Sequence, residues 1–143
     1  MINKETVLIV DDEKEISDLI EIYLKNEGYN VLKASNGIEA IKILEENEVH
    51  LIILDIMMPK MDGIQTCMKI REERNMPIIM LSAKSQDMDK IIGLSTGADD
   101  YVTKPFNPLE LMARVKSQLR RYTRLNTPNP KKKDEIEIGN ISI

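Results

Sequence analysis

Residues 51–55 restrict the fold more than any other stretch, because the apolar run Leu-Ile-Ile-Leu leads directly into the carboxylate of Asp55. A short, uninterrupted apolar run is typical of a strand that is buried on both faces, as in a parallel sheet covered by helices. Asp55 then lies at the carboxyl end of the strand, where open α/β sheets bind their ligands. Considered alone, Asp55 is explained equally well as the cap of the following turn or helix.

Similar apolar runs alternate with amphipathic helical patterns along the chain. The expected strands are 6–10, 29–33, 51–55, 78–82 and 101–103. The expected helices are 14–27, a segment that starts at 37 and carries Ile38, Ile41 and Leu44 on one face, then 64–73, 87–97 and 108 to about 121. Strands that alternate with helices through short links predict an α/β fold, with a five-stranded, doubly wound parallel sheet and helices on both faces.

Composition excludes several classes of protein. With 143 residues, the chain can hold one domain of ordinary size and a tail. Its formal net charge of -4 provides no overall basic field for nucleic acid. No apolar run is long enough to span a bilayer, and residues 1–5 lack the apolar core of a signal peptide, so we expect a cytoplasmic protein without a membrane partner. Cys67 and His50 are the only residues of their types, which excludes an internal disulfide and a metal cluster of cysteine and histidine.

Four of the five expected strands end in polar side chains, in the order Asp11 with Asp12, Asp55, Ser82 and Lys104. Because the carboxyl ends of the strands meet at one edge of a doubly wound sheet, we expect these side chains to share a crevice. Three crowded carboxylates repel one another and imply a compensating cation. Mg²⁺ fits best, because it prefers hard oxygen ligands and needs only one or two protein carboxylates.

These groups are the parts needed to receive a phosphoryl group on a carboxylate. Asp55 is the predicted nucleophile because it stands alone after a central strand, and Lys104 and Ser82 provide a positive charge and a hydroxyl donor. Each residue also has a plain structural interpretation, since Asp11 and Asp12 could begin a helix and Lys104 could lie on the surface. Their joint arrival at one edge of the sheet favours the chemical interpretation.

Four segments that carry these residues resemble the receiver domain of bacterial response regulators. They are Val-Asp-Asp-Glu at 10–13, Leu-Asp-Ile-Met-Met-Pro at 54–59 with Asp-Gly at 62–63, Leu-Ser-Ala at 81–83, and the stretch 97–106. The resemblance implies a flavodoxin-like sheet with the strand order 2-1-3-4-5. It also implies that a sensor histidine kinase phosphorylates Asp55, and that the chain is no enzyme but a phosphoacceptor that assists its own phosphorylation and dephosphorylation.

The same resemblance implies roles for the other residues at this edge. The implied ligands of Mg²⁺ are Asp11, Asp12, Asp55 and the carbonyl of Met57. Ser82 and Lys104 would contact the phosphoryl oxygens, and a movement of Ser82 would accompany rotation of Tyr101, so that phosphorylation biases a two-state surface. A cis peptide bond between Lys104 and Pro105 is also implied.

Charged residues near the end of the chain resemble the branch of the family that carries a winged-helix DNA-binding domain. In that branch the fourth helix, fifth strand and fifth helix form a symmetric homodimer face after phosphorylation. The matching charged positions are Lys90, Asp99, Asp100, Glu110, Arg114 and Arg121. Exposed ion pairs would fix register more than affinity, and a solvated helix surface is the alternative. Segments 24–27, 114–116 and 118–122 are similar to regulators of glycopeptide-resistance type.

The pattern predicts a receiver at 1–122, a linker at 123–135 and the truncated start of a DNA-binding effector domain at 136–143. Promoter DNA would then be bound only through the missing effector domain. A receiver that acts through protein contacts alone, as in a phosphorelay or chemotaxis, remains an alternative. A haloacid-dehalogenase-like phosphohydrolase is disfavoured, because it requires a second aspartate two residues after the nucleophile and Met57 holds that position.

Overall fold

The computed structural model describes residues 5–58, 62–83 and 97–126, with side chains up to Thr123. The elements in these ranges are β1 (Thr6–Val10), α1 (Lys14–Asn26), β2 (Asn30–Ala34), α2 (Gly37–Glu46), β3 (Leu51–Asp55), α3 (Gly63–Arg71), β4 (Ile78–Ser82), β5 (Asp100–Thr103) and α5 (Pro108–Asn126). The helix expected at 87–97 lies outside the described residues. No helix in the described ranges is long and apolar enough to cross a membrane.

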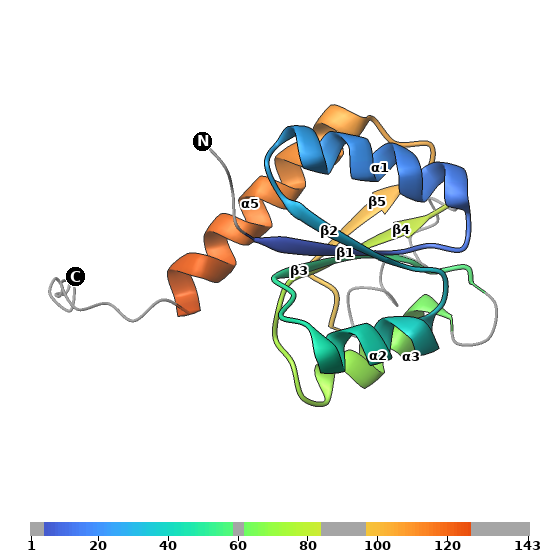
Figure 1. Cartoon of the computed structure of the whole chain (residues 1–143), viewed down its shortest axis with the longest axis vertical. Helices are drawn as coiled ribbons and strands as arrows, with labels where there is room; N and C mark the ends of the chain where they lie inside the picture. Colours follow the sequence, from blue (N-terminus) through green and yellow to red (C-terminus); the bar gives the residue numbers. More distant parts are fainter. Residues whose placement is uncertain (1–4, 59–61, 84–96, 127–143) are drawn as a thin grey trace, which may run out of the picture.

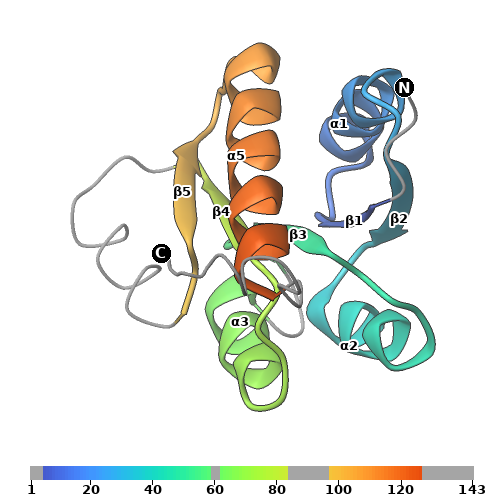
Figure 2. The same cartoon turned by 90° about the vertical axis from the view of Figure 1, so that its left-hand side faces the viewer.

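The five strands form one parallel sheet in the order β2-β1-β3-β4-β5, which confirms the predicted fold and strand order. Helices α1 and α5 pack together on one face, and α2 and α3 pack together on the other (Figures 1 and 2). The register pairs Val10 with Leu54, Asp55 with Leu81, and Ser82 with Thr103. The residues that follow β1, β3, β4 and β5 are therefore brought to the same edge of the sheet.

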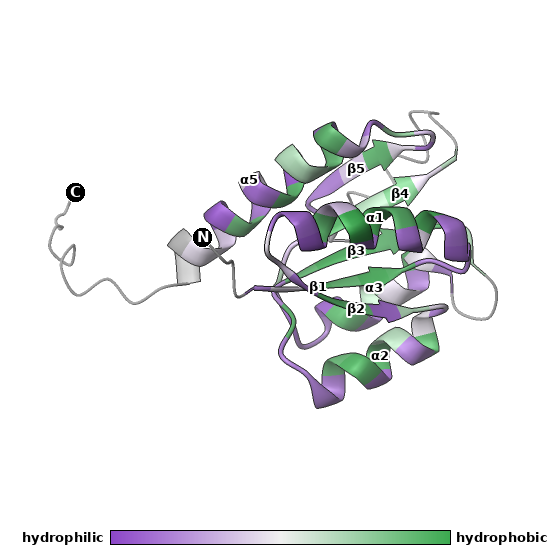
Figure 3. Ribbon diagram, turned by 45° about the horizontal axis from the view of Figure 1, so that its top comes forward, coloured by the Kyte–Doolittle hydropathy of each residue, from purple (hydrophilic) through white to green (hydrophobic). Residues whose placement is uncertain are grey.

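The central strands are apolar on both faces because each face is covered by a pair of helices. Alternate residues of β3 enter different core clusters, with Ile52 and Leu54 in one and Leu51 and Ile53 in the other. In Figure 3 these strands are mostly coloured as hydrophobic, whereas hydrophobic and hydrophilic residues alternate along the helices on either side. Burial of each such side chain stabilises the fold by about 1.5–3 kcal/mol, so the sheet holds its carboxyl edge in a fixed shape.

Local hydrogen bonds explain where the helices on one face begin. The Asn36 side chain accepts a hydrogen bond from the backbone N–H of Glu39 at 2.8 Å and caps α2. Asp62 and Gln65 form a reciprocal capping box at the start of α3. A Cβ at Gly63 would collide with the carbonyl oxygen of Asp55, so only glycine lets α3 start against the end of β3.

Several boundaries differ from the sequence prediction. Helix α3 spans Gly63–Arg71 instead of 64–73, and β5 begins one residue earlier than predicted, at Asp100. Helix α1 ends at Asn26, and β2 is shifted by one residue to Asn30–Ala34, because Asn30 pairs with Thr6 at the start of β1. Helix α5 continues to Asn126, beyond the predicted end at about residue 121, so the first four residues of the predicted linker are helical. No proline interrupts the helix between Pro108 and Pro128, which explains the extension.

Candidate functional site

The turn after β1 places two carboxylates at the carboxyl edge. Asp11 is 3% exposed, and its backbone N–H donates to the carbonyl of Ala34 at 3.1 Å, next to the end of β2. Its Oδ1 accepts a hydrogen bond from the N–H of Glu13 at 2.8 Å, which fixes the turn into α1. Asp12 is exposed. The turn therefore directs one carboxylate inward and leaves its neighbour accessible to solvent.

Asp55 is buried at the end of β3, in the centre of the sheet, with 3% exposure. Its Oδ1 accepts a hydrogen bond from the N–H of Met57 at 3.2 Å. Its Oδ2 lies 3.6 Å from the Nζ of Lys104. The acceptor predicted from the sequence is thus held by the rigid part of the fold, and one of its oxygens faces the predicted lysine.

The structure brings the three predicted acidic ligands together. One carboxylate oxygen from each of Asp11, Asp12 and Asp55 lies within 4.8 Å of the others. Burial, followed by the charge of Asp11, raises the pKa of Asp55 from 3.8 to about 6, although Lys104 and the Met57 N–H act in the opposite direction. Like charges held this close favour a cation between them, as the sequence predicted.

Lys104 also reaches this edge, directly after β5. Its backbone N–H donates to the carbonyl of Ser82 at 2.7 Å, and the Lys104–Pro105 peptide bond is cis, as predicted. Its Nζ donates to Asp11 Oδ2 at 3.1 Å and to Glu13 Oε1 at 2.9 Å. Burial lowers the pKa of the ammonium, but the Glu13 hydrogen bond and the charges of Asp11 and Asp55 outweigh burial, so the pKa lies above its ordinary value.

A hollow of about 370 Å³ opens above the acidic cluster. It is lined by Asp12, Glu13, Asp55, Met57, Ala83 and Lys104. Small Ala83 forms part of its wall, and Met57 stands at the rim with 58% of its surface exposed. The hollow leads from solvent to the carboxylate of Asp55 and has room for a group of phosphoryl size with bound water.

The two predicted switch residues are both buried. Ser82 ends β4 with 1% exposure, and Tyr101 lies on β5 as part of the core cluster that covers the α2 and α3 face. On β4, the residue paired with Tyr101 is Met80, which lies two positions before Ser82. Ser82 and Tyr101 lie on neighbouring strands, two register positions apart, and their coupling remains a prediction.

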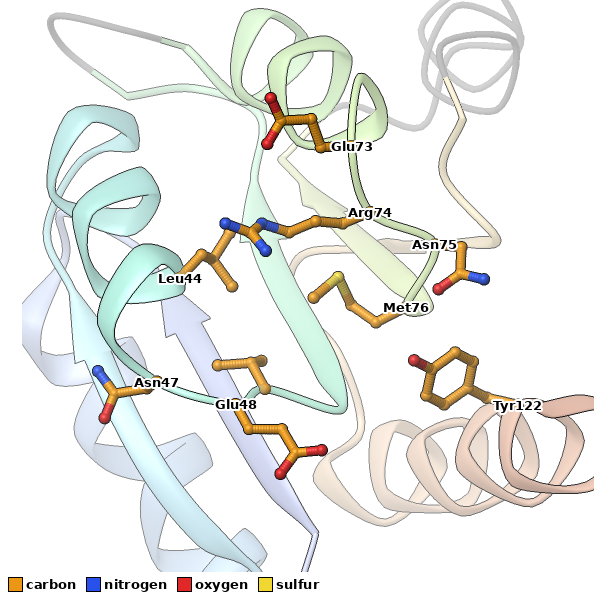
Figure 4. A pocket seen from close by; sticks show the side chains of 9 residues that line it. Leu44, Asn47, Glu48, Glu73, Arg74, Asn75, Met76 and Tyr122 are labelled. Carbon is orange, nitrogen blue, oxygen red and sulfur yellow. The ribbon is translucent and has the colours of Figure 1, made fainter. Parts of the chain in front are cut away.

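Another hollow, of about 240 Å³, lies at the opposite edge of the sheet and contains none of the predicted site residues. It is lined by Leu44, Asn47, Glu48, Val49, Glu73, Arg74, Asn75, Met76 and Tyr122 (Figure 4). Val49 and Met76 precede the amino ends of β3 and β4, whereas Asp55 is the last residue of β3, at its carboxyl end. This hollow is therefore separated from the acidic cluster by the length of the sheet.

Four of the charged residues predicted to form a homodimer face, Asp99, Asp100, Glu110 and Arg114, make contacts within the chain. Arg114 Nη1 contacts both Asp100 oxygens at 2.8 and 3.0 Å, and its Nη2 contacts Glu110 Oε2 at 2.9 Å. Asp99 pairs instead with Arg71, at 2.7 Å, and the same oxygen accepts the N–H of Ile78 at 2.9 Å. Arg121 is exposed, and Lys90 lies outside the described residues.

Two residues with clear contacts were not singled out from the sequence. Glu13 has no predicted role beyond its place in the Val-Asp-Asp-Glu segment, yet it holds Lys104. Arg71 lies in an expected helix and has no predicted role, yet its Nε donates to the carbonyl of Gly97 at 2.8 Å and its guanidinium pairs with Asp99. Gly97 has a φ of 110°, and a Cβ there would collide with the Arg71 side chain. In the sequence, the available signal for the Arg71 contacts was Gly97, which lies shortly before Asp99 and Asp100.

Comparison with known proteins identifies the family to which a chain with this fold and this site belongs. Residues 7–116 match the response regulator receiver domain, and the chain belongs to that family. Among relatives, it is 55% identical over 122 residues to the regulatory protein VanR of Enterococcus faecium and 54% identical to VanRc of Enterococcus gallinarum. Each alignment covers 85% of this chain and 53% of the relative, so the chain spans about half the length of these proteins.

Solved receiver structures have the same fold. The receiver domain of the Francisella response regulator 1452 is 38% identical with a TM-score of 0.78, over 82% of this chain and 98% of that one. The BeF3-activated N-terminal receiver domain of RstA from Klebsiella pneumoniae is 33% identical with a TM-score of 0.78, over 81% and 99% of the two chains. The family and the fold predicted from the sequence are thereby confirmed.

Proposed function

We propose that this chain is the phosphoacceptor of a two-component system, and that a sensor histidine kinase phosphorylates Asp55. The observation that supports this most directly is the placement of Asp55. It is buried at the end of the central strand, clustered with Asp11 and Asp12, and its Oδ2 lies 3.6 Å from the ammonium of Lys104. The hollow above it, which Asp55 helps to line, gives a phosphoryl donor access to the carboxylate.

The transfer step follows from nucleophilic attack by the Asp55 carboxylate on the phosphorus of a phosphohistidine. An O–P bond forms and the P–N bond breaks, with the electron pair left on the imidazole nitrogen, which takes a proton. The product is an acyl phosphate. Lys104 is positioned to neutralise phosphoryl oxygens, and the hydroxyl of buried Ser82 is the proposed second contact.

The donor set fits Mg²⁺. The cluster offers only carboxylate oxygens, two of its three residues are buried, and the adjoining hollow leaves space for water ligands. We propose Asp11, Asp12, Asp55 and the carbonyl of Met57 as the residues that hold the ion. Bound there, Mg²⁺ would offset the carboxylate repulsion and the charge that develops on the phosphoryl oxygens.

Phosphorylation would act on the rest of the molecule through Ser82 and Tyr101, and we propose that it favours a homodimer that uses β5 and α5. The Asp100–Arg114–Glu110 contacts keep charged groups ordered on that surface. Because the chain spans about half the length of the VanR relatives, control of transcription through promoter DNA is proposed only for a protein that also carries an effector domain.

Intact-mass measurement after incubation with acetyl phosphate tests the proposal. We expect one phosphoryl adduct on the wild-type chain that requires Mg²⁺ and is absent from Asp55→Asn. Asp18→Asn is a matched control, because Asp18 is a helix-surface carboxylate paired with Lys14 and Lys33 and lies outside the cluster. An adduct that persists in Asp55→Asn would refute the assignment. A folded wild-type chain that takes no phosphoryl group from either acetyl phosphate or a histidine kinase would also refute it.

A further inference from the structure

Lys104 is held by a carboxylate that lies outside the acidic cluster. Its Nζ is 2.9 Å from Glu13 Oε1 and 3.1 Å from Asp11 Oδ2, whereas Asp55 Oδ2 is 3.6 Å away. The two shorter distances are hydrogen bonds and the third is longer than a direct one. In the unphosphorylated protein the ammonium is therefore displaced from the phosphoacceptor toward the turn between β1 and α1.

The position of Glu13 explains how it can hold the lysine and still release it. Glu13 precedes α1, and its backbone N–H is fixed by Asp11 Oδ1 at 2.8 Å. Its side chain reaches into the hollow from the rim and remains 61% exposed, compared with 13% for Lys104. A carboxylate with this exposure regains water when it loses its partner, so release costs little free energy.

We propose that Glu13 is a positioning residue for phosphoryl transfer, which holds Lys104 in a resting position and yields it when a phosphoryl group arrives on Asp55. The inference rests on the proposed function. A phosphoryl group carries about 1.5 to 2 negative charges, so its oxygens compete successfully with one exposed carboxylate for the ammonium. Formation of the activated state then includes loss of the Glu13–Lys104 pair, which lowers the stability of that state relative to the resting one.

Removal of the Glu13 charge should therefore favour the activated state. Fluoroberyllate, a stable mimic of the phosphoryl group, can be titrated into the Mg²⁺-loaded chain and followed by ¹⁹F NMR. We expect Glu13→Gln to bind it about two- to fivefold more tightly than wild type, the range that an exposed ion pair contributes. Glu15→Gln is the matched control, because it removes the same charge from an exposed position in the first turn of α1. We expect its affinity to equal that of wild type.

The position of the side chains can be observed separately from affinity. With ¹³C-labelled glutamate, the carboxyl resonance of Glu13 should move to the value of a solvated side chain when fluoroberyllate binds. In Lys104→Met the resonance should already lie there without ligand. A Glu13 resonance that is insensitive to both changes would overturn the proposed hold on Lys104.

These outcomes separate the inference from the function on which it rests. If wild type binds fluoroberyllate and Glu13→Gln binds it with the same or lower affinity than Glu15→Gln, the positioning role is wrong and the phosphoacceptor assignment stands. If the folded wild-type chain binds no fluoroberyllate in the presence of Mg²⁺, the phosphoacceptor assignment and the positioning role are both wrong.

Discussion

Asp55→Asn is expected to stabilise the protein in the absence of divalent cations, even though it removes the proposed phosphoacceptor. The pKa of Asp55 is raised from 3.8 to about 6, first by burial and then by the charge of Asp11. Because one pKa unit corresponds to about 1.36 kcal/mol, ionised Asp55 costs about 3 kcal/mol at neutral pH. Asparagine has a similar shape and no charge, so the variant should recover most of this free energy.

The sign of the pH dependence follows from proton binding. Between pH 3.8, the ordinary pKa, and about pH 6, the folded chain retains a proton on Asp55 that the unfolded chain has lost. The wild-type unfolding free energy therefore falls as the pH rises through this window and stays at the lower value above it. In Asp55→Asn this contribution is absent, so the advantage of the variant should be full at pH 7 and vanish near pH 4.

Urea denaturation in the presence of EDTA, at pH 7 and at pH 4, measures both effects. Glu15→Gln removes an exposed carboxylate and should change stability by no more than about 0.5 kcal/mol at either pH. If Asp55→Asn is no more stable than wild type at pH 7, or is equally stabilised at both pH values, the proposed carboxylate repulsion is wrong.

Three further changes test the metal site and the local structure that holds it. Mg²⁺ at ten times its dissociation constant should raise the unfolding free energy of wild type by about 1.4 kcal/mol. The same Mg²⁺ concentration should raise the unfolding free energy of Asp12→Asn by clearly less, and urea titrations with and without the ion measure both values. Gly63→Ala should cost about 1–3 kcal/mol in the same assay, because the new Cβ meets the Cα of Ile56 at 2.6 Å and the carbonyl oxygen of Asp55. Asn36→Ala should cost about 1 kcal/mol through loss of the α2 cap, measured by thermal and urea unfolding.

A different outcome would contradict each of these three predictions. Equal stabilisation of wild type and Asp12→Asn by Mg²⁺ would place the ion elsewhere. An unaffected Gly63→Ala would mean that α3 can move away from the end of β3. An unaffected Asn36→Ala would mean that water or another group satisfies the N–H of Glu39 equally well.

The sheet and most of the site follow from local patterns in the chain. Each central strand is a continuous apolar run because helices cover both faces, and polar residues after a parallel strand necessarily reach one edge. The positions of Asp11, Asp55, Ser82 and Lys104 could therefore be predicted without coordinates. The structure confirms that these residues lie at the carboxyl edge of the sheet.

Contacts between distant segments could not be predicted in this way. The pairing of Glu13 with Lys104 depends on the backbone of the turn before α1, and residues 91 positions apart meet there. The pairing of Asp99 with Arg71 depends on how α3 packs against the segment before β5. A pattern of charges indicates that ion pairs can form, whereas packing geometry decides which of them do form.

Borohydride trapping is the most direct test that Asp55 accepts the phosphoryl group. Borohydride reduces an acyl phosphate on aspartate to homoserine, and peptide sequencing by tandem mass spectrometry locates the new residue. After phosphorylation by acetyl phosphate with Mg²⁺, we expect homoserine at position 55 and unmodified aspartate at positions 11 and 12. Homoserine at position 11 or 12, or its absence from a chain that carries the phosphoryl mass, would contradict the assignment of Asp55.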